Sequence, residues 1–159
     1  MNIRIIAVGK LKEKYLTEAV KEYLKRLGGY GQVEVVEVPD EKAPEKASPA
    51  EEEQVRRKEA EGISRYLRLG AFVVVLAIKG KMLSSEELAG FIEDLGVKGR
   101  SNVVFVIGGS LGLHESVLQK ADLRLSFSRM TFPHQLMRVI LLEQLYRSFK
   151  INRGEPYHK

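Results

Sequence analysis

Three short segments have the composition and position expected of a site for a small polar ligand. Lys79–Lys81, Gly108–Gly112 and Ser128–Phe132 each follow a short apolar run that reads as a buried strand. In an open parallel sheet, ligands bind beyond the carboxyl ends of the strands. The glycines of the second segment would let a ligand approach the backbone closely. On their own they indicate a tight turn about as often as a ligand loop.

The glycine segment reads GGSLG, which argues against two familiar nucleotide-binding motifs. It matches neither GxGxxG nor a phosphate-binding loop ending in GK[ST], and no acidic residue follows at the spacing of a ribose partner. The three histidines, His114, His134 and His158, lack the spacing of metal ligands, and no HExxH is present. With no cysteine, the chain has no disulfide, thiolate zinc site or cysteine nucleophile. We therefore expect no metal.

The last six residues, Gly154–Lys159, combine an aromatic ring, an imidazole and a basic group. A nucleic-acid active site could use these groups for stacking, proton transfer and phosphate contact. A frayed polar terminus is an equally good interpretation of the same residues. His114 and His134 lie near predicted helix starts, where a hydrogen-bonding role is the simpler expectation.

The net charge of +5 is concentrated in one part of the chain. Between Arg124 and Lys159 there are seven of the 26 basic residues but only two of the 21 acidic ones, so the rest of the chain is balanced. A basic end suggests a polyanionic partner, most often nucleic acid. The alternative is a solvated helix end whose cations complement the helix dipole.

Strand and helix patterns alternate along the chain, which predicts an α/β fold: a mainly parallel sheet with helices on both faces. Strands are expected at 3–8, 32–38, 71–78, 103–107 and 123–127, and helices at 14–27, 48 to about 69, 84–95, 114–121 and 133–149. The alternation in 32–38 indicates a wetter face or an edge position. The charged stretch 39–54 reads as a crossover, so we expect one domain, 1–159. No apolar run suits a signal peptide or a membrane span, which favours a soluble, cytoplasmic protein.

The last predicted helix is apolar on more than one face. Residues such as Leu136, Val139, Ile140 and Leu141 cannot all lie on the single stripe that a surface helix needs. We therefore favour a homodimer in which this helix packs against a second copy. A fully internal helix of a monomer is the alternative.

Three stretches, FVIGGSLGL, LSFSRMTFPHQLMRVILLEQLYRSF and the terminal NRGEPYHK, closely resemble the RlmH family of SPOUT methyltransferases. The N-terminal IRIIAVGKLKEKYL is similar too, so the resemblance spans the chain. It implies a C-terminal trefoil knot and S-adenosylmethionine bound in the knot loops at a dimer interface. The family's cofactor positions match Leu76, Gly108, Phe127, Ser128, Arg129, Met130, Thr131 and Phe132, although the role of the Arg129 side chain stays open.

The resemblance also implies a reaction, methylation of N3 of a pseudouridine in helix 69 of 23S rRNA, with assembled ribosomes as substrate. The imide proton must leave, and a base with a pKa near the working pH does this best. His158 is the expected base, Tyr157 would stack on or hydrogen-bond to the nucleobase, and Arg138 and Arg147 would hold phosphate or the developing anion. Lys150, Arg153 and Lys159 are the expected RNA backbone contacts.

Three alternatives stay open at this stage. Arg147 could do no more than pair with Glu143 one turn before it. The chain could be a non-enzymatic ribosome-binding or RNA-binding protein that kept the fold. It could also be a doubly wound enzyme for another nucleotide, with GGSLG against phosphate.

Overall fold

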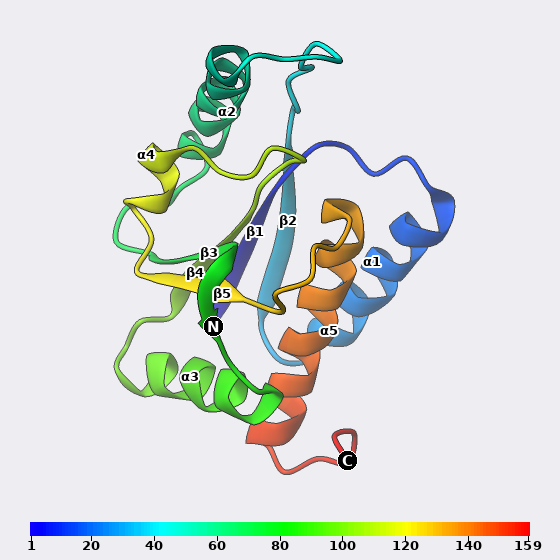
Figure 1. The fold of residues 1–159 in the computed structure, drawn as a ribbon. Coiled ribbons are helices and arrows are strands. Elements are labelled where there is room, and N and C mark those ends of the chain that lie inside the picture. Colours follow the sequence, from blue (N-terminus) through cyan, green and yellow to red (C-terminus); the bar gives the residue numbers. More distant parts are fainter.

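Five parallel strands form one sheet in the computed structural model, which describes residues 1–159 (Figure 1). The strands are β1 (Asn2–Val8), β2 (Gln32–Val38), β3 (Phe72–Met82), β4 (Asn102–Ile107) and β5 (Leu123–Ser126). Their order across the sheet is β2-β1-β4-β3-β5, and every pair is parallel. The predicted α/β class is confirmed, and the alternating segment 32–38 is indeed an edge strand.

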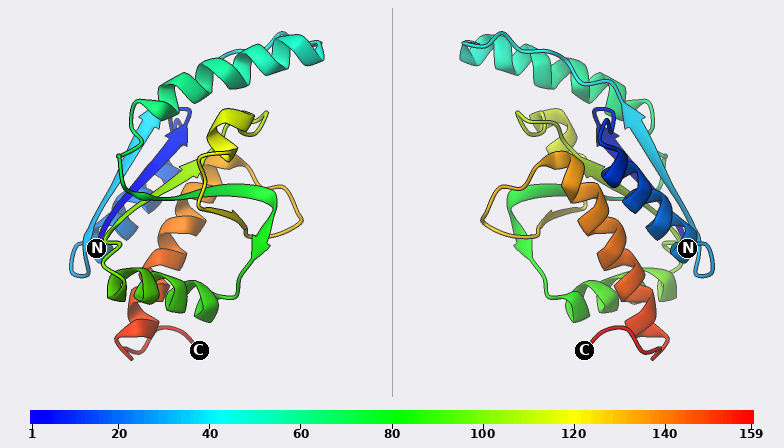
Figure 2. Two further views of the ribbon diagram at one scale, coloured as in Figure 1. Left: turned by 90° about the vertical axis from the view of Figure 1, so that its left-hand side faces the viewer. Right: turned by 90° about the vertical axis from the view of Figure 1, so that its right-hand side faces the viewer.

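Helices cover both faces of the sheet (Figure 2). On one face lie α1 (Lys14–Leu27), α3 (Ser85–Val97) and α5 (His134–Asn152), and on the other lie α2 (Pro49–Ser64) and α4 (Glu115–Leu118). Inner strands supply alternate residues to the two cores. In β4, Val103 and Phe105 face the first layer, whereas Val104 and Val106 face the second. Because both faces are covered, the inner strands read as continuous apolar runs.

Serine capping boxes fix the starts of α2 and α3. Ser48 accepts a hydrogen bond from the Glu51 amide, and Ser84 accepts one from the Glu87 amide. Each glutamate side chain in turn accepts a hydrogen bond from the backbone amide of its serine. The end of α2 differs from the prediction, since it stops at Ser64 and not near Leu69. The chain must reverse to enter β3, and Gly70 makes that turn with φ +80°.

The strand β3 is longer than predicted, and this corrects one of the expected ligand loops. Lys79–Lys81 belong to the strand, which leaves and then rejoins the ladder: Leu125 of β5 pairs with both Leu76 and Lys81. Gly80 permits the return, because a Cβ there would lie 2.6 Å from the carbonyl oxygen of Arg124. Elsewhere, α4 is shorter than the predicted helix 114–121, β5 ends one residue earlier than predicted, and α5 runs three residues past Phe149.

The last helix, α5, is buried along one side and partly exposed along another. Leu141, Leu142 and Leu145 are fully buried against the sheet, whereas Leu136 is 37% exposed. No helix of the chain has the length and hydropathy needed to cross a bilayer.

Candidate functional site

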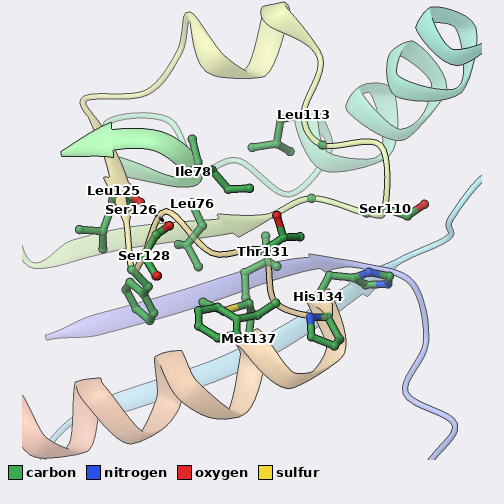
Figure 3. Close-up of a pocket in the computed structure, with 18 of the residues that line it drawn as sticks. Leu76, Ile78, Ser110, Leu113, Leu125, Ser126, Ser128, Thr131, His134 and Met137 are labelled. Carbon is green, nitrogen blue, oxygen red and sulfur yellow. Dashed lines mark hydrogen bonds between the residues drawn. The ribbon is translucent and has the colours of Figure 1, made fainter. Parts of the chain in front are cut away.

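A cavity of about 650 Å³ opens beside the middle of β3 and at the carboxyl ends of β4 and β5 (Figure 3). Its walls come from the middle of β3, the glycine loop after β4, the segment after β5 and the first turn of α5. The lining residues are Leu76, Ala77, Ile78, Ile107, Gly108, Gly109, Ser110, Gly112, Leu113, Leu118, Leu125, Ser126, Phe127, Ser128, Met130, Thr131, Phe132, Pro133, His134 and Met137. The site lies where open parallel sheets bind ligands.

Seven of the eight residues expected to bind a cofactor line this cavity: Leu76, Gly108, Phe127, Ser128, Met130, Thr131 and Phe132. Arg129 does not line it. The sequence reasoning missed the residues that follow Phe132 along the chain and also line the cavity: Pro133, His134 and Met137. A usable signal was present, because Pro133 places the start of α5 directly after the third expected loop.

The cavity wall carries no charged side chain. Its polar groups are hydroxyls, such as those of Ser110, Ser128 and Thr131, together with loop backbone, and His134 is its only titratable residue. Burial lowers the pKa of His134, and the nearby positive charge of Arg138 lowers it further. A neutral imidazole therefore faces the cavity at neutral pH. Such a site suits a ligand with a flat heteroaromatic part and does not repel a cationic centre.

The glycine loop is shaped by tight packing as well as by the cavity. A Cβ on Gly108 would lie 3.0 Å from Leu113 and 3.1 Å from the backbone of Gly112. A Cβ on Gly109 would lie 3.2 Å from Val8 and 3.3 Å from Glu59. Gly112 has φ +81°, and its amide closes the turn onto the Gly109 carbonyl at 3.1 Å. The loop is thus a tight turn that also lines a ligand cavity.

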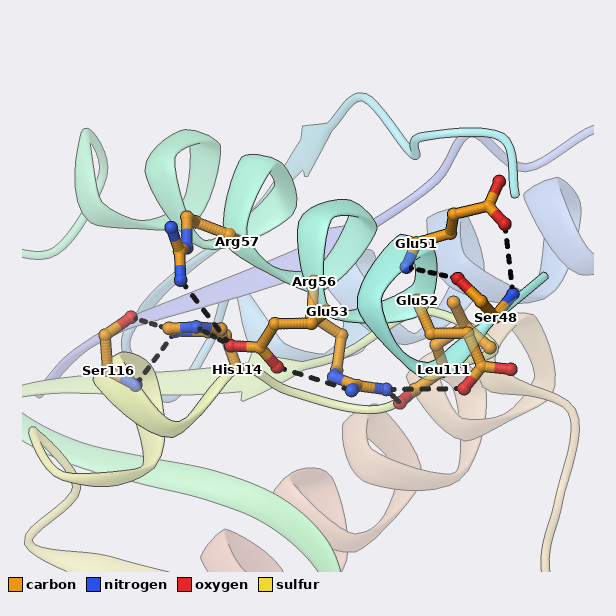
Figure 4. Close-up of polar contacts among 9 residues, drawn as sticks. All are labelled: Ser48, Glu51, Glu52, Glu53, Arg56, Arg57, Leu111, His114 and Ser116. Atoms are coloured by element: carbon orange, nitrogen blue, oxygen red, sulfur yellow. Dashed lines mark hydrogen bonds and ion pairs between the residues drawn. The ribbon is translucent and has the colours of Figure 1, made fainter. Parts of the chain in front are cut away.

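Helix α2 holds the outer side of this loop through a polar cluster that we call the α2 clamp: Glu53, Arg56 and His114 (Figure 4). Arg56 donates to the carbonyl oxygen of Leu111 at 3.5 Å and pairs with Glu53 at 3.4 Å. His114 caps α4 by accepting from the Ser116 amide at Nδ1, so its Nε2 donates to Glu53 at 2.8 Å. That bond is the main reason why the pKa of Glu53 is lowered. His114 therefore has the hydrogen-bonding role expected for it.

Arg138, expected to contact phosphate or the reacting anion, is instead fully buried. Its guanidinium pairs with Glu37 of β2 and donates to the carbonyl oxygens of Gly9 at 2.7 Å and Val8 at 3.2 Å. Its Nε has no partner. Within this structure the side chain is not available to a substrate. Its contacts join α5 to the end of β1.

The C-terminal tail folds back on the last turns of α5. Tyr157 donates to Glu143 at 3.2 Å and packs edge-on against Tyr146. The Nδ1 of His158 lies 3.0 Å from Arg147, and its Nε2 lies 2.6 Å from Glu86 of α3. Arg147 also pairs with Glu143, as its alternative interpretation expected. Burial raises the pKa of Tyr157 to about 12, so this residue stays a phenol.

The expected RNA contacts near the tail are partly engaged within the chain. Lys150 pairs with Glu155 at 2.9 Å, and Arg153 stacks over the ring of Tyr30. Glu155 also accepts from the Tyr30 hydroxyl at 2.6 Å. Lys159, the last residue, is exposed and unpaired. These contacts anchor the tail to α5 and to the turn that follows α1.

One chain does not bring its tail to its own cavity. The cavity lies at the first turn of α5 and the tail at the last (Figures 1 and 2). A helix of 19 residues spans about 28 Å at 1.5 Å per residue. The structure therefore brings Tyr157, His158 and Arg147 together, and the cavity residues together, but not the two groups with each other.

Comparison with known proteins places this architecture in context. A model of a protein family described as "Predicted SPOUT methyltransferase" matches residues 1–158. The chain is 60% identical, over the full length of both, to "Ribosomal RNA large subunit methyltransferase H" from Alkaliphilus oremlandii and equally to the protein of that name from Bifidobacterium adolescentis. A probable methyltransferase from Bordetella pertussis shares the fold, with a TM-score of 0.57 at 12% identity over 93% of this chain and 94% of that one.

Proposed function

The chain belongs to the SPOUT methyltransferase family, and on that premise we propose that it transfers a methyl group from S-adenosylmethionine to large-subunit ribosomal RNA. The supporting observation is the uncharged cavity at the strand ends, which is walled by seven residues expected to hold the methyl donor. The names of the full-length relatives support the RNA substrate. We further propose that the target is N3 of a pseudouridine in helix 69 of 23S rRNA within assembled ribosomes, which puts the reaction in the cytoplasm.

The cavity residues fit S-adenosylmethionine chemically. When bound, this cofactor supplies an electrophilic methyl group on a sulfonium centre. The glycine loop exposes backbone at Gly108 and Gly109, the apolar side chains Leu76 and Leu113 suit the faces of an adenine ring, and the neutral His134 adds no opposing positive charge. The C-terminal trefoil knot that the resemblance implies is part of this proposal.

We propose that a homodimer completes the active site, because the tail and the cavity lie at opposite ends of α5. Two α5 helices packed antiparallel would bring the tail of each chain to the cavity of the other. The partly exposed side of α5, with Leu136, Val139 and Ile140, supplies an apolar surface for this contact. The same surface explains why the helix is apolar on more than one face.

In this assembly His158 is the proposed base for the imide proton. An arginine only donates, so the Nδ1 of His158 accepts from Arg147 and its Nε2–H donates to Glu86. The imidazole is therefore neutral in this arrangement, and the lone pair on its Nδ1 could take up a proton. To act, it must exchange the Arg147 contact for the substrate. Tyr157, as a phenol, would stack on the nucleobase or donate to it.

Methyl transfer from labelled S-adenosylmethionine to assembled bacterial ribosomes that lack the modification tests this proposal. Free ribosomal RNA is run in parallel, and the product nucleoside is identified. We expect N3-methylpseudouridine on ribosomes and little label on free RNA. Label on another nucleoside would refute the target. If the folded protein shows no methyl transfer and no cofactor binding, the result favours a non-enzymatic RNA-binding role.

A further inference from the structure

The segment that follows β1 carries a group of free positive charges. Lys10, Lys12 and Lys14 are all exposed, and none of them forms an ion pair or a side-chain hydrogen bond. Tyr15, beside them, is 71% exposed and has no ring or hydrogen-bond partner. We call these four residues the lysine loop, although the last two, Lys14 and Tyr15, are the first residues of α1. The one acid within the segment is Glu13, so its local charge stays positive.

Hydrogen bonds to β2 and α5 hold the backbone at the start of the lysine loop in place. The amide of Gly9 donates to Val38 at 2.8 Å, and the amide of Leu11 donates to Glu37 at 2.9 Å. The buried Arg138 pairs with the same Glu37 and donates to the Gly9 carbonyl, so that this carboxylate is neutralised. The loop backbone is therefore fixed by contacts that leave its four side chains outside.

The position of Gly9 relates the loop to the cavity wall. A Cβ on Gly9 would lie 3.6 Å from the Nε2 of His134, which lines the cavity. In Figure 1 the chain leaving β1 passes the start of α5, and Figure 3 shows His134 at that edge of the site. The lysine loop thus starts next to a residue that lines the cavity, at the end of α5 opposite to the chain's own tail.

We propose that the lysine loop binds the RNA substrate at the rim of the cavity, with the three lysines on backbone phosphates and Tyr15 stacked on an unpaired base. This inference rests on the proposed function. Mobile, unpaired ammonium groups are suited to phosphates, and an exposed tyrosine ring is suited to the splayed bases of RNA loops. The C-terminal cations Arg147 and Lys150 differ, because carboxylates of their own chain already engage them.

The charge test replaces all three lysines, as Lys10→Gln, Lys12→Gln and Lys14→Gln. A matched control removes the same charge from exposed lysines outside this segment that likewise form no ion pair, as Lys21→Gln, Lys25→Gln and Lys58→Gln. Binding to large ribosomal subunits, and to a labelled RNA stem-loop of helix 69, is measured over a range of KCl concentrations. We expect the loop variant to bind at least about tenfold more weakly near 0.1 M salt, with a salt slope lower by about 2, because each single-strand phosphate contact contributes about 0.7. The control should stay within about twofold of wild type.

The stacking test compares Tyr15→Ala with Tyr15→Phe. Loss of the ring should weaken binding about tenfold, whereas loss of the hydroxyl alone should leave it unchanged, because stacking needs only the ring face. In every variant the thermal midpoint and the binding of S-adenosylmethionine should match those of wild type, since the four side chains are exposed and form no ion pair, side-chain hydrogen bond or ring contact within the chain.

Several results would overturn the inference. If loop and control variants bind RNA equally, the lysine loop is not the contact, while methyl transfer by wild type would leave the proposed function standing. Dissociation of a dimer by the loop substitutions would make the loop a subunit contact, and loss of cofactor binding would assign it to the cofactor site. If wild type neither binds nor methylates any ribosomal RNA, both proposals fail together.

Discussion

Replacing the buried Arg138 by methionine distinguishes a structural guanidinium from one that acts on the substrate. In the structure this side chain is inaccessible and joins α5 to β1 and β2 through Glu37 and the carbonyl groups of Val8 and Gly9. Methionine has a similar length and no charge. The substitution should therefore leave these three acceptors without their donor while creating little empty space.

The size of the effect follows from those contacts. Leaving a buried acceptor unsatisfied costs about 1–3 kcal/mol, and breaking a fully buried ion pair costs about 3–5 kcal/mol. Glu37 is 39% exposed, so water partly solvates its orphaned charge, and the lost Nε had no partner. We expect the free energy of unfolding to fall by about 3 kcal/mol. For a chain of this size, that lowers the melting temperature by about 6–12 °C.

Urea unfolding of wild type, Arg138→Met, Glu37→Gln and the double variant measures this effect. The two single changes should be non-additive by at least about 1 kcal/mol, because the residues share one contact. S-adenosylmethionine binding to the folded variant below its melting temperature should be weakened modestly at most. The reasoning would be refuted by an Arg138→Met protein as stable as wild type but without turnover. That result would restore the catalytic role expected from the sequence.

Other features lead to further predictions. Gly108→Ala should weaken cofactor binding, measured by calorimetry, at least about tenfold, because the new Cβ would lie 3.0 Å from the Leu113 side chain and push it aside. Binding equal to wild type would mean that the loop shifts to accommodate the methyl group. Arg56→Ala, which releases the glycine loop from α2, should weaken the same binding a few-fold without lowering the melting temperature by more than about 4 °C. His158→Ala should keep near-normal cofactor binding and lose most turnover, and unchanged turnover would remove it from the mechanism. Burial raises the pKa of Glu59 above its ordinary value of 4.5. Protonation of this carboxyl therefore stabilises the folded state below pH 4.5, and that stabilisation is lost as the pH rises through the raised pKa. Glu59→Gln should therefore raise the urea midpoint at pH 7.5 by more than at pH 4.5, and a gain independent of pH would contradict this.

The layered fold could be read from the sequence because local signals were strong and consistent. The continuous apolar runs 71–78 and 103–107 required cover on both faces, and Ser48 and Ser84 marked helix starts through their capping boxes. The cavity could also be located, since the glycine loop and the segment after Leu125 meet at one edge of a parallel sheet. Each of these inferences used residues close together in the sequence.

The parts that could not be predicted depend on contacts between distant residues. Lys79–Lys81 look like a polar loop, and only the close approach of Gly80 to Arg124 of β5 makes them a strand. Arg138 looks like a helix-surface cation, and only Glu37, about a hundred residues earlier, gives it a buried partner. No local pattern encodes such pairings.

The strand order has a consequence for how the protein is made. β1 leaves the ribosome before the other four strands of the sheet, yet it lies inside the sheet, and its inner neighbour β4 pairs Asn102 with Asn2. At about 5–20 residues per second, that partner is synthesised about 5–20 s later. Until then the nascent chain leaves the backbone edge of this largely apolar strand unpaired on the β4 side. Ribosome-bound chaperones should therefore engage the N-terminal third of this small protein for much of its synthesis.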